Sequence, residues 1–122
     1  MANAANTYSD YCFRIVGAAT TNSQLINATP CWFTGYSVGN INAAPVYLKI
    51  YDKATAPTVG TDVPVLVVLI PGNVAGSGAN VTLPKGIYLV NGLGMGLVAG
   101  LTDSSTTATS ANEQVINIFY QK

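Results

Sequence analysis

The chain has 122 residues, of which 49% are hydrophobic and only 8% are charged, and its five basic and five acidic residues give a net charge of zero. This length allows one domain with its own core, and the composition excludes an intrinsically disordered chain. The basic residues are scattered, whereas a protein that neutralises phosphates needs them in a cluster, so we expect no nucleic-acid partner.

The residues that usually carry catalysis are scarce. The sequence has no histidine, which is the commonest general base and the commonest metal ligand. Its acidic residues are isolated from one another, and only Asp52 and Asp62 flank a common loop. We interpret these two as turn-forming carboxylates, with a cation site as the alternative. The protein is therefore expected not to be an enzyme and to need no metal or cofactor.

The sequence predicts a short N-terminal arm followed by one folded domain. Residues 1–10 are small and polar and are expected to form an extended arm, and residues 11–122 to form the domain. The start lacks the basic region and the apolar run of a secretory signal. The most apolar stretches, 63–70 and 87–101, are shorter than a membrane helix requires, so we expect no membrane association.

The only two cysteines, Cys12 and Cys31, are expected to be free and buried. Free cysteine is among the most buried residue types. Two cysteines in a chain of this length do not make a disulfide framework, although one bridge between them is the alternative.

Twelve glycines and six prolines divide the chain into short segments that are rich in strand-forming residues. Loops are expected at 52–62, 71–80 and 102–112, and Asn91-Gly92 is expected to join two strands in a hairpin. Such spacing predicts an all-β fold, a single-domain antiparallel β-sandwich or jelly roll of about eight short strands. In chain order the expected strands are 11–16, 31–38, 46–51, 63–70, 81–83, 86–91, 94–101 and 113–120.

The clearest strand is 46–51, because it alternates with the period of two of a half-buried strand. Val46, Leu48 and Ile50 fall on one face. The opposite face places a lysine between two tyrosines and is interpreted as a solvent or partner surface, made of Tyr47, Lys49 and Tyr51.

The segment 63–70 is nearly continuous in Val, Leu and Ile, which indicates a strand covered on both faces. It is either a central strand of the sandwich or a strand with a partner subunit on its outer side. Together with the 46–51 face it provides the candidate subunit-contact residues, namely Tyr47, Lys49, Tyr51, Val63, Val65 and Val67.

Two further features have the character of ligand sites. Gly94, Gly96 and Ala99 have the spacing of a dinucleotide-binding loop, but no helix pattern follows them. A glycine-spaced strand that allows close backbone approach, for instance to another subunit, is preferred. Trp32 lies between Cys31 and Phe33 in an apolar strand and is expected in the core. The alternative is an exposed Trp32 that stacks on sugars together with tyrosines.

The run from Val46 to Asp62, VYLKIYDKATAPTVGTD, resembles small structural proteins encoded among the head and tail genes of tailed bacteriophages. The segments Leu83–Ile87, Thr102–Thr107 and Val115–Tyr120 fit the same pattern, and so does the glycine-rich stretch before residue 101. The resemblance implies a capsid decoration, or cement, protein with a β-sandwich or jelly-roll fold.

By this resemblance the chain would assemble in the host cytoplasm, act as a homo-oligomer, with a trimer favoured, and clamp major capsid protein subunits on the capsid exterior of the virion. Such proteins act through surfaces, so no site residues are carried over. The alternative function is a carbohydrate-binding or receptor-binding β-sandwich module of a phage tail or fibre.

Overall fold

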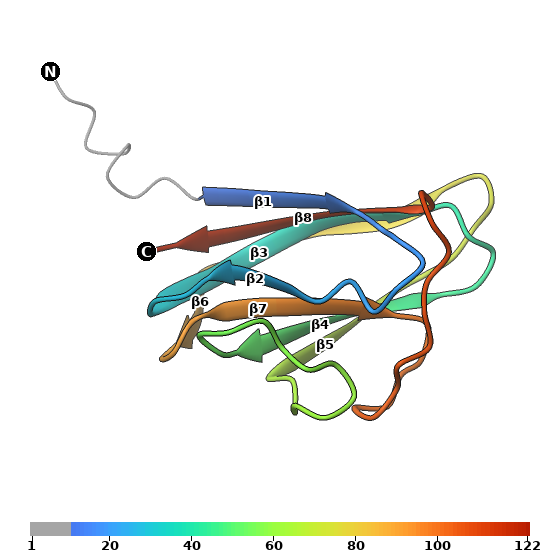
Figure 1. The fold of residues 1–122 in the computed structure, drawn as a ribbon. Coiled ribbons are helices and arrows are strands. Elements are labelled where there is room, and N and C mark those ends of the chain that lie inside the picture. The colour runs from blue at the N-terminus through green and yellow to red at the C-terminus, as the bar shows by residue number, and fades with distance from the viewer. Residues whose placement is uncertain (1–10) are drawn as a thin grey trace, which may run out of the picture.

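The computed structural model describes residues 11–122, and these form eight strands and no helix (Figure 1). The arm predicted for residues 1–10 lies outside the described residues. Within the described range, no helix capable of crossing a bilayer is found. The strands are β1 (Tyr11–Val16), β2 (Gln24–Asn27), β3 (Cys31–Asn40), β4 (Val46–Asp52), β5 (Leu66–Ile70), β6 (Ser77–Leu89), β7 (Leu93–Val98) and β8 (Gln114–Gln121).

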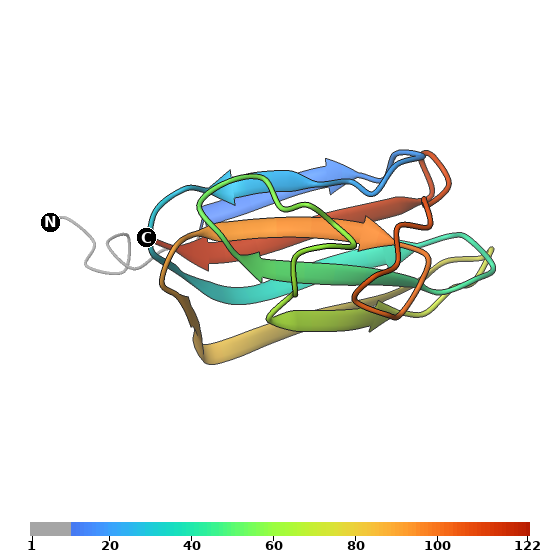
Figure 2. The ribbon, with the colours of Figure 1, turned by 60° about the horizontal axis from the view of Figure 1, so that its bottom comes forward.

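The strands form two four-stranded antiparallel sheets that pack face to face (Figures 1 and 2). Sheet A has the order β1-β8-β3-β6 and sheet B the order β2-β7-β4-β5. Every connection crosses from one sheet to the other except the one between β4 and β5, which are neighbours in sheet B. This order is that of a jelly roll, so the predicted all-β sandwich is confirmed.

The core lies between the two sheets and is made of the inward-facing half of each strand. Sheet A contributes Phe33, Ile116 and Ile118, all fully buried. From sheet B, the alternate residues Leu48 and Ile50 pack into the same layer, as their spacing predicts. The single buried layer explains why eight short strands hold together as one domain.

Both cysteines are free, as expected. Cys31 is buried in the core, but Cys12 is exposed, so the prediction that both are buried was wrong for Cys12. It lies opposite Phe119 on the outer face of sheet A, because the alternation of β1 directs Phe13 and Ile15 toward the core instead.

Strand β6 runs unbroken through 13 residues, where a glycine-rich loop, a short strand and a turn were expected. Pro84-Lys85-Gly86 does not end the strand. Gly86 adopts a left-handed φ of 76°, and the β3–β6 register shifts between Phe33 and Gly35, so the extra residues are absorbed as a bulge. Long-range pairing with β3 therefore outweighs the local turn signal.

Asn91-Gly92 does not form the expected hairpin, because β6 and β7 belong to different sheets. The Asp52 carboxylate accepts hydrogen bonds from the backbone N–H groups of Val90 and Asn91, at 3.1 and 2.8 Å, and more weakly from Gly92 at 3.4 Å. This carboxylate fixes a turn that carries the chain across the sandwich.

Two strand assignments at the edges of sheet B also differ from expectation. Strand β2 was not predicted, and its four residues are only half-buried. Strand β5 begins at Leu66 rather than residue 63, and it lies at the edge of sheet B, so the interpretation as a central strand was wrong. Figure 2 shows β5 at the margin of the sheet.

Buried amide side chains fix the loops at one end of the sandwich. The Asn22 side chain accepts the Ala18 N–H at 2.8 Å and donates to the Leu97 carbonyl and the Thr109 hydroxyl at 3.1 and 2.9 Å. These bonds join the β1–β2 loop, β7 and the loop before β8. An uncharged side chain thus makes connections that ion pairs often make in other proteins.

We expect Gly35→Ala to destabilise the fold by about 2 kcal/mol or more, because overpacking a closed site has this cost. A Cβ atom at Gly35 would lie 2.3 Å from the Val81 carbonyl oxygen, and the residue has a φ of 155°. Urea unfolding measures the change.

Gly39→Ala on the same strand is the matched control, because its Cβ would lie 3.4 Å from the nearest atom, on the Val115 side chain. It should change the free energy of unfolding by no more than about 0.5 kcal/mol. Equal effects of the two substitutions would contradict the bulge as the reason for a glycine at position 35.

Candidate interaction surfaces

The two aspartates considered for a cation site are bonded to the chain's own groups. Asp52 holds the β6–β7 turn, and Asp62 binds the Lys53 ammonium at 2.5 Å and the Thr58 N–H at 2.7 Å. No three His, Cys, Asp or Glu side chains gather anywhere in residues 11–122. The turn-forming role of these aspartates is confirmed by these hydrogen bonds.

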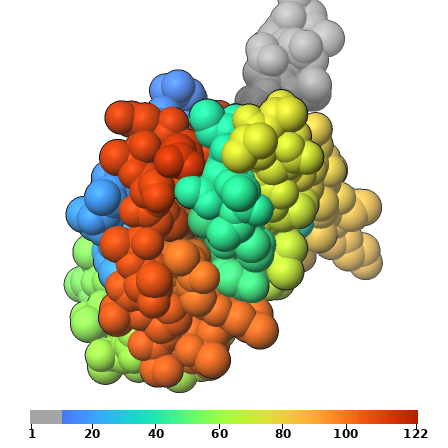
Figure 3. All heavy atoms as spheres, turned by 90° about the vertical axis from the view of Figure 1, so that its right-hand side faces the viewer, coloured from blue at the N-terminus to red at the C-terminus, as the bar shows by residue number. Residues whose placement is uncertain are grey.

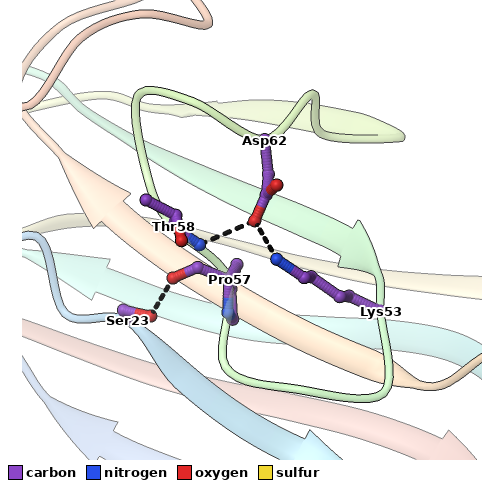
Figure 4. A network of polar contacts seen from close by, with 5 residues as sticks. All are labelled: Ser23, Lys53, Pro57, Thr58 and Asp62. Atoms are coloured by element: carbon purple, nitrogen blue, oxygen red, sulfur yellow. Dashed lines mark hydrogen bonds and ion pairs between the residues drawn. The ribbon is translucent and has the colours of Figure 1, made fainter.

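The loop of residues 53–65 lies over the outer face of sheet B and is held there by polar contacts (Figure 4). The Asp62 pair with Lys53 closes the loop on itself, and the hydrogen bond from Lys53, followed by that from Thr58, lowers the pKa of Asp62. The Ser23 hydroxyl donates to the Pro57 carbonyl at 2.5 Å, which ties the loop to the start of β2.

The glycines of β7 allow this loop to approach the sheet closely. A Cβ atom at Gly94 would lie 2.9 Å from Pro57, and one at Gly96 would lie 2.6 Å from Val59. The close approach expected at these glycines is therefore made, but by side chains from a loop of the same chain rather than by another subunit. Val59, Tyr51 and Val98 form a second small hydrophobic cluster beneath the loop.

Lys49 and Tyr51 are buried, with 0% and 1% of their surfaces exposed. The alternation of β4 was predicted correctly, but the interpretation of these two residues as solvent or partner surface was wrong. The reason is the cover formed by the 53–65 loop and by the loop of residues 99–113, where the Thr102 carbonyl accepts a hydrogen bond from Lys49 Nζ at 2.5 Å.

Burial changes the titration of both side chains. Removal from water lowers the pKa of Lys49, an effect that the Asp103 carboxylate opposes. Burial also raises the pKa of Tyr51, and the carboxylates of Asp62 and Asp103 add to this increase. The Tyr51 hydroxyl has no hydrogen-bond partner among residues 11–122. Because both side chains are buried, neither is available to a ligand at the surface.

The other four candidate contact residues lie at or near the β5 edge of sheet B. Val63 is 74% exposed and Val65 is also largely exposed, whereas Val67 and Tyr47 are half-buried. Sequence reasoning did not single out Leu69, which lies opposite Tyr47 and is 55% exposed. The structure thus gathers exposed apolar side chains here, and their role as subunit contacts stays a prediction.

The outer face of sheet A carries an exposed aromatic pair. Trp32 is 41% exposed and Tyr88, directly opposite on β6, is 48% exposed, with ring centroids 4.9 Å apart. The expectation that Trp32 lies in the core was wrong. The signal was present in the sequence, because the flanking Cys31 and Phe33 both point inward and alternation then directs Trp32 outward.

A polar row crosses the middle of the same face. Arg14, Asn117, Ser37 and Asn80 lie opposite one another on β1, β8, β3 and β6. The Ser37 hydroxyl donates to the side-chain amide oxygen of Asn80, and the Asn117 side-chain amide donates to the Ser37 backbone carbonyl at 3.0 Å. The result is a sheet surface with amide and hydroxyl groups and one charge.

A hollow of about 690 Å³ lies at the end of this face. Gly39 and Gly78 stand opposite each other there without side chains, beside Val16 and Val115. Figure 3 views this end of the molecule, where the β3–β4, β5–β6 and β7–β8 loops lie side by side. The hollow is open, and its lining combines small and apolar residues with polar ones, namely Asn40, Asn112, Glu113 and Gln114.

Comparison of the chain with protein-family models and with curated protein sequences finds no match in either. No activity is therefore transferred to it from a relative. Three features of the structure itself bear on function, namely the covered outer face of sheet B, the open outer face of sheet A and the apolar β5 edge.

We expect Lys49→Met to be as stable as the wild type or more stable at pH 7, because a side chain of similar volume replaces a buried ammonium. As the pH rises toward the ordinary lysine pKa of about 10.4, the wild type should gain stability relative to the variant. The native lysine, with its lowered pKa, releases its proton before the unfolded chain does. Urea unfolding at several pH values measures the difference.

Lys85→Met is the control, because Lys85 is exposed and its removal changes the net charge equally. Its stability relative to the wild type should not follow the same trend. A constant difference between the wild type and Lys49→Met from neutral to alkaline pH would contradict the burial of a charged Lys49.

Proposed function

We propose that the chain is a structural protein of a tailed-phage virion, and specifically a capsid cement or decoration protein. In this role it binds major capsid protein subunits on the head exterior as a homo-oligomer, for which the sequence resemblance favours a trimer. The observation that carries the proposal is the surface of residues 11–122, where eleven large hydrophobic side chains are exposed, in a chain with only ten charged residues.

Such a surface supports association better than a solitary existence in solution. Contiguous apolar surface that stays exposed in one subunit is typical of protein–protein interaction sites. The outer face of sheet A is wide and almost uncharged, and the β5 edge is apolar, so both suit contact with other subunits. Binding to the assembled shell alone would stabilise that shell by mass action.

The mechanism needs no reacting group. Asp52 and Asp62 make hydrogen bonds or ion pairs within the chain, and Lys49 is buried beneath its loops. Stabilisation would come from apolar area buried across the joints between subunits, at about 25 cal/mol per Å² before the costs of association.

Purified protein should co-sediment with phage heads assembled without it, reach saturation at a fixed ratio to the major capsid protein, and raise the temperature at which the heads break. Electron microscopy of labelled protein would locate it on intact particles. Absence of head binding, or label confined to the tail, would overturn the cement role.

The exposed pair Trp32 and Tyr88 favours a second candidate, a carbohydrate-binding or receptor-binding module of a tail or fibre. Aromatic rings at the surface of a sheet present flat apolar faces on which sugar rings stack. The polar row of amide and hydroxyl groups on the same face could bind sugar hydroxyls. This candidate uses the outer face of sheet A and leaves β5 free.

If this second function holds, a glycan array should give a ligand whose affinity falls about tenfold or more in Trp32→Ala, the loss expected for about 1.4 kcal/mol of stacking. Tyr11→Ala is the matched control, because Tyr11 is as exposed as Tyr88 but stacks on Tyr120 instead. An array without a specific ligand, or equal losses in the two variants, would exclude Trp32 as a stacking platform.

A further inference from the structure

Strand β5 is an open edge of the sandwich. Its one hydrogen-bonded neighbour is β4, and no other strand of the described chain pairs with its far side (Figure 2). An edge strand presents a row of unpaired N–H and C=O groups that can pair with a strand of another chain. Proteins that stay monomeric usually block such edges with charges, prolines, bulges or short strands.

The three other edge strands have such features. Strand β1 carries the exposed Arg14 on its outer face. Strand β2 is only four residues long and its register shifts between Leu25 and Asn27. Strand β6 contains Pro84 and Lys85 at its bulge. Each of these edges is therefore a poor template for a partner strand.

Strand β5 is nearly as short as β2, with five residues against four, but it lacks the other features. Its sequence, Leu-Val-Val-Leu-Ile, contains no charge, proline or glycine, and it pairs with β4 in an unbroken register over all five residues. Leu66 and Val68 point toward the core but are only half-buried, and Leu69 is 55% exposed. The sequence of β5 is thus as apolar as that of a strand covered on both sides, whereas its own chain covers it on only one side.

We propose that β5 pairs with β5 of a second copy of the chain, antiparallel about a two-fold axis, and joins the two B sheets into one continuous eight-stranded sheet. This contact rests on the proposed function, because it names one joint through which the structural subunit assembles. It extends the predicted contact surface at Val63, Val65 and Val67 to Leu69.

A second copy suits this edge because the strand is self-complementary. With the axis at Val68, the midpoint of the strand, Leu66 lies opposite Ile70 of the partner and Val67 opposite Leu69 of the partner. Residues directly opposite in an antiparallel pair share a face, so inward side chains meet inward ones and extend the core. No like charges face each other, and the net charge of zero adds no repulsion between copies.

The two-fold contact produces dimers, or hexamers if a trimer also forms through another surface. Light scattering of the full chain over a concentration series should therefore give a mass that rises from 12.6 kDa toward an even multiple. Leu69→Lys should weaken association about tenfold or more, because it places two lysines beside the joint. Val16→Lys, which adds the same charge to edge strand β1, should leave association unchanged.

A cross-linking experiment tests the register directly. Opposed residues of antiparallel strands have Cα atoms about 4.5–5.5 Å apart, which a disulfide can span. In a Cys12→Ser background, Val68→Cys should form a disulfide-linked dimer on mild oxidation, whereas Val90→Cys, on an exposed residue beyond β6, should not. Circular dichroism confirms that each variant is folded.

The outcomes separate this contact from the cement role. A monomer at all concentrations, a purely trimeric species, equal effects of the two lysine substitutions, or failure of Val68→Cys to cross-link would overturn the β5 pairing. Head binding that persists in any of these cases would leave the cement role intact. Dimers that cross-link at Val68 without head binding would support the pairing and overturn the cement role.

Discussion

The structure depends on the burial of the two central strands of sheet B, β4 and β7, on both faces. Its inner face packs on sheet A. Its outer face lies beneath the 99–113 loop and the 53–65 loop, and the second of these approaches closely because β7 has glycines at positions 94 and 96. This cover removes Lys49 and Tyr51 from the surface. It also decides which surfaces are left for other molecules, namely the outer face of sheet A and the exposed edge at β5.

A chain with so few charges needs other groups to hold its loops. Amide side chains fill this role: Asn22 joins three segments, and Asn40 binds the carbonyls of Ala44 and Pro71 at 3.0 and 3.3 Å. Such bonds lose little strength when the site is closed to water, whereas an ion pair loses hydration of both charges on burial. The architecture therefore keeps its exterior almost neutral without leaving its loops unanchored.

The sequence predicted the fold class because the period-two pattern and the turn residues are local signals. The predicted number of strands, eight, is correct partly because two errors cancel. Strand β2 was missed, and two expected strands are one continuous strand, β6. The bulge at Gly86 and the covering of Lys49 depend on contacts between distant segments, which a local pattern does not contain. The apolar run that ends at Ile70 indicated a strand covered on both sides. Only the order of strands in the sheet shows whether the same chain provides that cover.

The unequal accessibility of the two thiols gives the molecule a natural reporter. Cys12 lies on the outer face of sheet A, across from Phe119, while Cys31 is enclosed in the core. An alkylating reagent would thus modify a native monomer at a single sulfur atom. The rate of that modification in an assembled particle would reveal whether this face is occluded, without any change to the sequence.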